Sequence, residues 1–203
     1  MDEAKPSPPR GAARRAVFLD KDGTLVRDVP YNVDPALLEF TPNALAGLDR
    51  LASAGFALFI VTNQPGLASG RFSRRDFAAL EAALRARVEA ECGVRIEALF
   101  CCPHLPGGDG RPACLCRKPA PGLMRQAALA HGVDLGRSWM IGDILDDIEA
   151  GHRAGCQAIL LDVGNETEWK LSPIRRPDAV CADLLAAAQF IEGADAPRRA
   201  NGR

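Results

Sequence analysis

The feature that most constrains this chain is a repeated alternation of short apolar runs with longer stretches of helical spacing. Short apolar runs that end at polar or glycine-bearing strings are typical of buried parallel strands. Helices between such strands cover both faces of a parallel sheet. We therefore predict an α/β fold, a Rossmann-like three-layer sandwich around a central parallel sheet. The predicted strands are residues 16–19, 56–61, 96–101, 139–141 and 158–161.

Capping residues mark several of the predicted helices. Thr41-Pro42 resembles an N-cap followed by proline at the first helical position, and Gly55 is the expected stop. Ser73 and Asp76 form a capping-box pattern at the start of the next helix. The apolar stripe of that helix is Phe77, Leu80, Leu84 and Val88. Further helices are expected from near Pro121, over 146–154 and over 184–191.

Length and composition indicate one soluble domain. A chain of 203 residues with 47% in the hydrophobic class can bury one substantial core, which we expect over 16–192, between disordered tails at 1–15 and 193–203. A net charge of −1 gives no field that attracts nucleic acid or an anionic membrane surface. No secretory signal or bilayer-spanning run is present, so we expect a cytoplasmic location, where the seven cysteines would be reduced thiols or metal ligands. We also expect a monomer.

Two carboxylates follow the first apolar run directly, in the string Asp20-Lys21-Asp22-Gly23-Thr24. The carboxyl ends of strands are where α/β proteins keep their chemistry. Two aspartates one residue apart can hold a hard cation, and one can attack phosphorus while the other handles the leaving-group proton. The pair predicts an aspartyl-phosphate enzyme, and the alternative is a solvated Asp-Gly turn.

Groups that could bind a phosphoryl group follow at the ends of later elements. Thr62, Asn63 and Gln64 end the second predicted strand, where a hydroxyl or an amide could donate to a phosphoryl oxygen. Arg117 and Lys118 are adjacent cations that could neutralise a transferring phosphoryl group and hold a second anionic group. The alternatives are ordinary turn composition and a solvated basic pair.

A further set of acids follows the fourth predicted strand. Asp143 comes directly after its apolar residues, and Asp146 and Asp147 lie just beyond. One of these carboxylates could complete an oxygen site for Mg²⁺, and another could hold a cationic partner. The alternative is that Asp146 and Asp147 are simply favourable acids in the first turn of a helix.

A second metal pattern lies between the third strand and Arg117. Cys102, His104, Cys114 and Cys116 offer three thiolates and one imidazole, a standard set for structural zinc. A zinc ion there would order a glycine-rich loop that cannot bury a core of its own, and would fix where Arg117 points. The alternatives are a loop disulfide or unliganded thiols.

These ordered motifs resemble the haloacid dehalogenase superfamily of phosphohydrolases, over about 17–185. The resemblance implies a nucleophile at Asp20 and a general acid and base at Asp22, whose backbone carbonyl would also bind Mg²⁺. It further implies Mg²⁺ ligation by Asp20 and Asp143. The remaining implied roles are phosphoryl binding by Thr62, phosphoryl stabilisation by Lys118 and support of the site by Asp147.

The cysteine and histidine pattern before Arg117 resembles one branch of that superfamily, the cap-less D-glycero-D-manno-heptose 1,7-bisphosphate 7-phosphatases and the related histidinol-phosphate phosphatases. The resemblance implies substrate contacts at Asp28 and Tyr31, and recognition of a second phosphate by Arg117. Ile144 and the stretch 164–169 differ from the pattern of the heptose enzymes. The short connections 25–40 and 64–72 leave no room for a folded cap domain.

We therefore expect a phosphatase that depends on Mg²⁺ and carries Zn²⁺, with a small phosphorylated sugar as its substrate and a heptose bisphosphate as the leading candidate. Histidinol-phosphate phosphatase activity is the nearest alternative. A non-catalytic, zinc-ordered binding protein is an alternative of another class. A phosphotransferase or mutase is disfavoured by the missing cap, because transfer between sugars requires that water be excluded.

Overall fold

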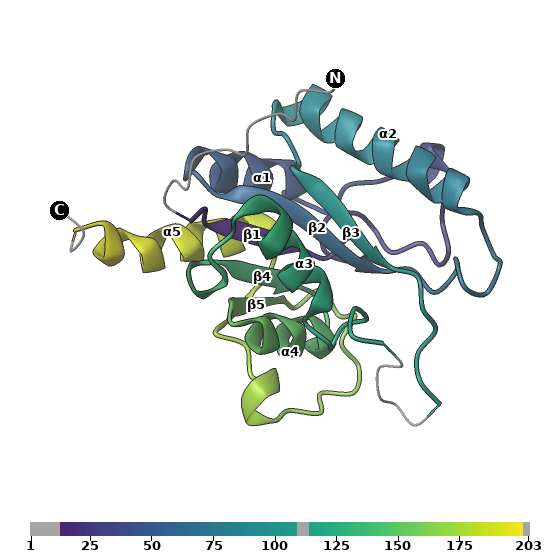
Figure 1. The fold of residues 1–203 in the computed structure, drawn as a ribbon. Coiled ribbons are helices and arrows are strands. Elements are labelled where there is room, and N and C mark those ends of the chain that lie inside the picture. The colour runs from purple at the N-terminus through teal and green to yellow at the C-terminus, as the bar shows by residue number, and fades with distance from the viewer. Residues whose placement is uncertain (1–12, 109–113, 201–203) are drawn as a thin grey trace, which may run out of the picture.

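A central parallel sheet organises the computed structural model, which describes residues 13–108 and 114–200 (Figure 1). Its six strands lie in the order β3-β2-β1-β4-β5-β6, and every neighbouring pair is parallel. The strands are β1 (Ala16–Leu19), β2 (Ala57–Asn63), β3 (Ala98–Cys102), β4 (Trp139–Gly142), β5 (Gln157–Leu161) and β6 (Ala179–Cys181). The predicted α/β sandwich is therefore confirmed.

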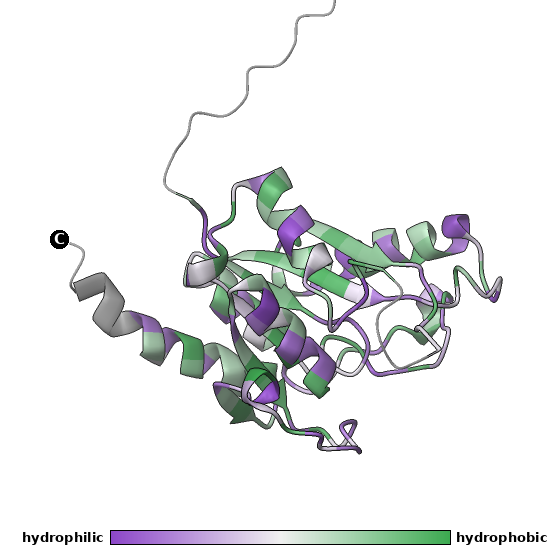
Figure 2. Ribbon diagram, turned by 60° about the horizontal axis from the view of Figure 1, so that its bottom comes forward, coloured by the Kyte–Doolittle hydropathy of each residue, from purple (hydrophilic) through white to green (hydrophobic). Residues whose placement is uncertain are grey.

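Helices cover both faces of this sheet. The helices are α1 (Ala44–Ser53), α2 (Arg74–Cys92), α3 (Gly122–His131), α4 (Leu145–Ala154) and α5 (Leu184–Ala200), with short 3-10 turns at Pro35–Leu37, Leu135–Arg137 and Pro173–Arg175. Apolar side chains of α1, α2 and α5 form one core with Val17 and Leu19, whereas those of α3 and α4 form a second core with Ala16 and Phe18. Figure 2 shows hydrophobic residues along the strands between these layers.

Strand β1 lies at the centre of the sheet and is fully buried. Phe18 pairs with Phe59 of β2 on one side and with Met140 of β4 on the other. The hydrogen bonding between β1 and β4 continues one residue past the end of β1, because the backbone N–H of Asp20 donates to the carbonyl of Ile141 at 3.0 Å. The carboxyl ends of β1, β2 and β4 thus meet at one edge, where parallel sheets place their sites.

Helix boundaries agree with the predicted caps at some ends and differ at others. The capping box of Ser73 and Asp76 is present, and the predicted stripe of α2 is buried. Helix α1 begins at Ala44 rather than at Pro42. The reason is that the Thr41 hydroxyl donates to the carbonyl of Thr24 at 2.7 Å, so it binds the turn after β1 instead of capping the helix.

The C-terminal helix is longer than predicted, since α5 continues from Ile191 to Ala200. Ion pairs beyond Ile191 tie it to the rest of the chain, from Glu192 to Arg50 at 2.6 Å and from Asp195 to Arg15. Much of the tail expected at 193–203 is therefore helical, whereas residues 1–12 and 201–203 of the expected tails lie outside the described residues.

Two connections bear on access to the sheet edge. The segments from β1 to α1 and from β2 to α2 are described in full, and the only regular element within them is the 3-10 turn Pro35–Leu37. The predicted absence of a folded cap is thus met in these two segments. Among the helices of the described residues, none is both long and apolar enough to cross a membrane.

Candidate active site and cysteine–histidine cluster

The turn after β1 folds back tightly against Asp143. Gly23 has a φ of +83°, and a Cβ built there would lie 2.3 Å from Oδ2 of Asp143, so only glycine fits. The backbone N–H of Gly23 donates to the carbonyl of Val26 at 2.8 Å, which closes the turn. This brings the Thr24 hydroxyl within 2.8 Å of Oδ1 of Asp143, to which it donates.

Lys118 contacts Asp20, the residue that directly follows β1. Its ammonium group forms ion pairs with Asp20 and with Asp147, the latter at 2.6 Å, and donates to the carbonyl of Val61 at 3.0 Å. Burial alone would lower the pKa of Lys118, but the two carboxylates outweigh this effect and raise it. The lysine is therefore a fixed positive charge beside Asp20.

Asp20, Asp143 and Asp147 form a carboxylate cluster, with one oxygen of each within 4.8 Å of the others. Burial and the charge of Asp20 raise the pKa of Asp143 to about 6. Three carboxylates face the single ammonium of Lys118, so the cluster favours added positive charge. Asp20 and Asp143 line the cavity at this edge of the sheet, whereas Asp147 is buried behind it, so Asp20 and Asp143 are the carboxylates suited to a hard divalent cation such as Mg²⁺.

Asp22 stands apart from the carboxylate cluster. Its Oδ2 accepts from Nε2 of Gln64 at 2.9 Å, and its Oδ1 pairs with the ammonium of Lys21. Burial raises the pKa of Asp22 despite the charge of Lys21. A carboxyl group with a raised pKa at the edge of a cavity is suited to give and take a proton.

The polar residues at the end of β2 mostly support their neighbours. The hydroxyl of Thr62 is buried and accepts from Nε2 of Gln64 at 3.0 Å. Asn63 exchanges two hydrogen bonds with the backbone of Lys118, each 3.1 Å long. The Asn63 amide, expected as a donor to a phosphoryl oxygen, therefore holds the Lys118 loop in place.

An open cavity of about 480 Å³ joins most of the predicted site residues. The predicted residues that line it are Asp20, Asp22, Asp28, Tyr31, Asn63, Gln64, Arg117, Lys118 and Asp143. Thr62 and Asp147 do not line it, because they are buried behind it. Tyr31 is half exposed, and the Arg71 guanidinium lies 4.4 Å from the centre of its ring. The cavity therefore offers both acids and cations to a ligand.

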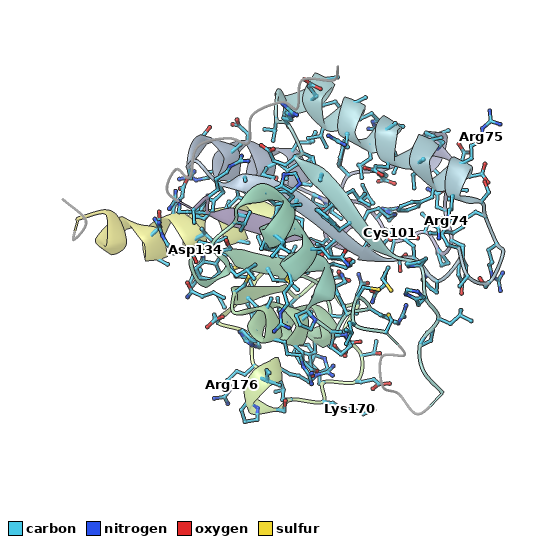
Figure 3. All side chains as sticks on the ribbon, viewed as in Figure 1. Arg74, Arg75, Cys101, Asp134, Lys170 and Arg176 are labelled. Atoms are coloured by element: carbon cyan, nitrogen blue, oxygen red, sulfur yellow. The ribbon has the colours of Figure 1, made fainter. Side chains whose placement is uncertain are left out.

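The cysteine–histidine cluster consists of Cys102, His104, Cys114 and Cys116. Its sulfur atoms are 3.3 to 3.6 Å apart, and Nδ1 of His104 lies 3.5 Å from Cys102 Sγ and 3.3 Å from Cys116 Sγ. The sulfur separations exceed the disulfide length of about 2.05 Å, and ligands about 2.3 Å from a tetrahedral zinc are spaced similarly. In Figure 3, sulfur atoms gather near the labelled Cys101 at the end of β3.

This cluster leads directly into the active-site loop. The backbone N–H of Arg117 donates to Sγ of Cys114 at 3.3 Å, and the Arg117 guanidinium donates to the carbonyl of His104 at 3.1 Å. Burial opposes ionisation of Cys114, but hydrogen bonds from the Arg117 N–H and the neighbouring thiols outweigh it and lower the pKa of Cys114 to about 7. The geometry fits zinc, and the cluster fixes the start of the loop that carries Lys118.

Two residues at the site were missed by the motif analysis. Thr24 belongs to the string that was singled out, but no role was assigned to its hydroxyl. Asn165 follows β5, and its Nδ2 donates to Oδ2 of Asp143 at 2.8 Å. The available signal was position, since a polar residue just past a strand of the parallel sheet lies at the same edge as Asp20.

Comparisons with known proteins place this chain among phosphatases. Residues 115–187 match the model of the HAD-hydrolase-like family. The D-glycero-beta-D-manno-heptose-1,7-bisphosphate 7-phosphatase of Pseudomonas aeruginosa is 34% identical over 88% of this chain and 98% of its own length. The D-glycero-D-manno-heptose-1,7-bisphosphate 7-phosphatase of Thermosynechococcus vestitus is 34% identical over 91% of this chain and 99% of its own.

Solved structures of similar fold include phosphatases of this kind. The D,D-heptose 1,7-bisphosphate phosphatase of Bordetella bronchiseptica, complexed with magnesium and phosphate, has a TM-score of 0.73 and 31% identity, over 89% of this chain and 99% of that one. A putative HAD-like phosphatase from Mesorhizobium loti has a TM-score of 0.74 and 32% identity, over 94% of this chain and 91% of that one. The chain therefore belongs to the heptose 1,7-bisphosphate 7-phosphatase family of HAD-like hydrolases, and it is a phosphatase.

Proposed function

We propose that this protein removes the 7-phosphate of D-glycero-D-manno-heptose 1,7-bisphosphate, in the synthesis of heptose precursors for surface polysaccharide. The observation that carries this proposal is the position of Arg117, which lines the same cavity as Asp20 and Lys118. A guanidinium there can grip a second phosphate in a bidentate way while the first lies against Asp20. Asp28 and Tyr31, at the same cavity, would contact the sugar.

In the first step a carboxylate oxygen of Asp20 attacks the phosphorus, and the bond between phosphorus and the sugar oxygen breaks. Asp22 gives its proton to the departing oxygen, for which its raised pKa suits it. The ammonium of Lys118 neutralises charge on the phosphoryl oxygens. Thr62, which is buried behind the cavity, supports the site through its hydrogen bond with Gln64. Bound Mg²⁺, held by Asp20, Asp143 and the backbone carbonyl of Asp22, would add positive charge at the transferring group.

In the second step Asp22, now ionised, takes a proton from a water molecule as that water attacks the phosphorus. The bond between Asp20 and phosphorus breaks, which frees inorganic phosphate and restores both carboxyl groups. Asp147 keeps Lys118 in place through both steps, because their ion pair is buried behind the cavity. Asn63 and Gln64 orient Lys118 and Asp22 respectively.

The cysteine–histidine cluster, in this proposal, binds one structural Zn²⁺. Four protein ligands leave no open position for water, so the ion would take no part in the chemistry. Its contribution would be to hold the backbone of Arg117 and so the wall of the cavity. We further propose that the phosphatase domain of 16–192 works as a cytoplasmic monomer without nucleic-acid or membrane partners.

Phosphate release from a panel of phosphorylated metabolites tests this function, with Asp20→Asn as the inactive reference. We expect the heptose 1,7-bisphosphate to give the highest kcat/KM, and Asp20→Asn to lose turnover while its fold and zinc content stay intact. A higher kcat/KM on histidinol phosphate would contradict the substrate assignment. Retained turnover in Asp20→Asn would contradict the nucleophile assignment.

A further inference from the structure

Both oxygens of Asp143 are held by side-chain donors from different parts of the chain. Oδ1 accepts from the Thr24 hydroxyl and Oδ2 accepts from Nδ2 of Asn165, each at 2.8 Å. Asp143 is buried, so neither bond is readily replaced by solvent. Each carboxylate oxygen can accept more than one bond, so the two donors fix the plane of the group and still leave it able to bind a cation.

The segment that carries Asn165 is anchored beside Asp143. Oε2 of Glu166 accepts from the backbone N–H of Leu145 at 2.8 Å, and Leu145 is the first residue of α4. Oε1 of Glu166 accepts from the N–H groups of Glu168 and Trp169 at 2.8 and 3.2 Å. One carboxylate therefore caps α4 and shapes the segment, which fixes Asn165 relative to the end of β4.

A second set of contacts holds the far end of the same segment to α4. Arg175 forms ion pairs with Asp146 at 3.0 Å and with Glu149 at 3.1 Å. His152 contacts the carbonyl of Ile174 at 2.8 Å and Asp178 at 3.0 Å. The segment from Asn165 to Asp178 is thus tied at both ends to the helix that follows Asp143.

We infer that Asn165 is a positioning residue, which orients the Asp143 carboxylate for the divalent cation of this site. The inference rests on the metal site of the proposed function. A neutral amide suits this role, because it donates to Asp143 without adding a fourth carboxylate or a competing cation. The fit is close, since a Cβ on Gly23 would lie 2.5 Å from Nδ2 of Asn165. Partners that orient a metal ligand in this way typically change metal affinity when removed.

The test measures Mg²⁺ binding by titration calorimetry, with MgCl₂ as the only ligand, for the full chain and for Asn165→Ala. The expected result is a Kd for Mg²⁺ about 10 to 100 times higher in the variant. In parallel, the Mg²⁺ concentration for half-maximal phosphate release should rise, whereas KM for the sugar phosphate at saturating Mg²⁺ should not. Glu168→Gln is the matched control, because its side chain is exposed and forms an ion pair with the similarly exposed Lys170, away from Asp143.

The outcomes separate the possible failures. An unchanged Kd in Asn165→Ala, with normal binding by the unaltered chain, would overturn this inference and leave the proposed function standing. No Mg²⁺ binding by the unaltered chain would overturn both. A merely structural role would lower the unfolding temperature without moving the Kd, and this too would overturn the inference.

Glu166→Ala provides a second variant, should Asn165→Ala fold poorly. It should also weaken Mg²⁺ binding, because it frees the segment that presents Asn165. In the double variant the two losses should not add, since both act through the same contact to Asp143. Full additivity, or normal Mg²⁺ binding by Glu166→Ala, would overturn the anchoring role of Glu166.

Discussion

Replacing Lys118 by methionine tests the charge balance of the carboxylate cluster. Methionine is a long side chain that can replace the aliphatic part of lysine, but it leaves the buried acids Asp20 and Asp147 without their cation. Removing one partner of a buried ion pair typically costs about 3 to 5 kcal/mol. For a chain of this size that corresponds to a fall of roughly 10 °C in the unfolding temperature. Lys170→Met is the control, because Lys170 is exposed at the outer side of its segment (Figure 3).

The pH dependence of this loss follows from Asp143. Its pKa in the folded protein, about 6, lies above the ordinary value of 3.8, so between these values the folded state binds more protons than the unfolded state. Stability from this group therefore falls as pH rises through that window. Loss of the Lys118 charge raises the pKa further and extends the window upward.

Thermal unfolding in Mg²⁺-free buffer at pH 5 and pH 8 measures both effects. We expect the Lys118→Met deficit to be larger at pH 8, and added Mg²⁺ to recover part of the stability there but not the phosphatase activity. An unfolding temperature equal to that of the unaltered protein at pH 8 would refute the reasoning. A deficit that is the same at both pH values would refute it as well.

Three other predictions concern single positions. Asp22→Asn should nearly abolish phosphate release, because an amide can neither give a proton to the leaving oxygen nor take one from water, and phosphate release close to that of the unaltered protein would contradict this role. Metal analysis should find about one zinc per chain, and the zinc content should be lower in Cys114→Ser. A disulfide between Cys114 and Cys116 in metal-free protein would contradict the zinc site. Arg117→Ala should cost on the order of 2 kcal/mol more in kcat/KM on the bisphosphate than on a monophosphate, and equal losses would direct testing to histidinol phosphate.

Local patterns predicted the fold well where the chain is buried. The apolar residues of β1 and the stripe of α2 are buried, as their apolar spacing predicts. The predicted start of α1 and the predicted end of α5 were wrong, because contacts with residues distant in sequence determine them. Thr41 binds the turn after β1, and Arg15 and Arg50 pair with acids of α5. Strand β6 was missed because it is only three residues long and partly exposed.

The site was predictable where chemistry demands particular residues in a short string, as at Asp20 and Asp143. It was less so where a residue acts through another. Asn63 holds the Lys118 backbone, and Asn165 holds Asp143 from 22 residues further along the chain. Such contacts depend on how segments approach in space, which neither spacing nor residue type reveals.

The cysteine–histidine cluster also determines which part of the chain can change in length. His104 and Cys114 meet at the cluster, so the sequence between them joins two points that lie close together. The entropy of closing such a loop rises only slowly with its length. Insertions or deletions between these two residues should therefore leave Arg117 and Lys118 in register with Asp20, so this loop can vary in size and sequence while the catalytic geometry is retained.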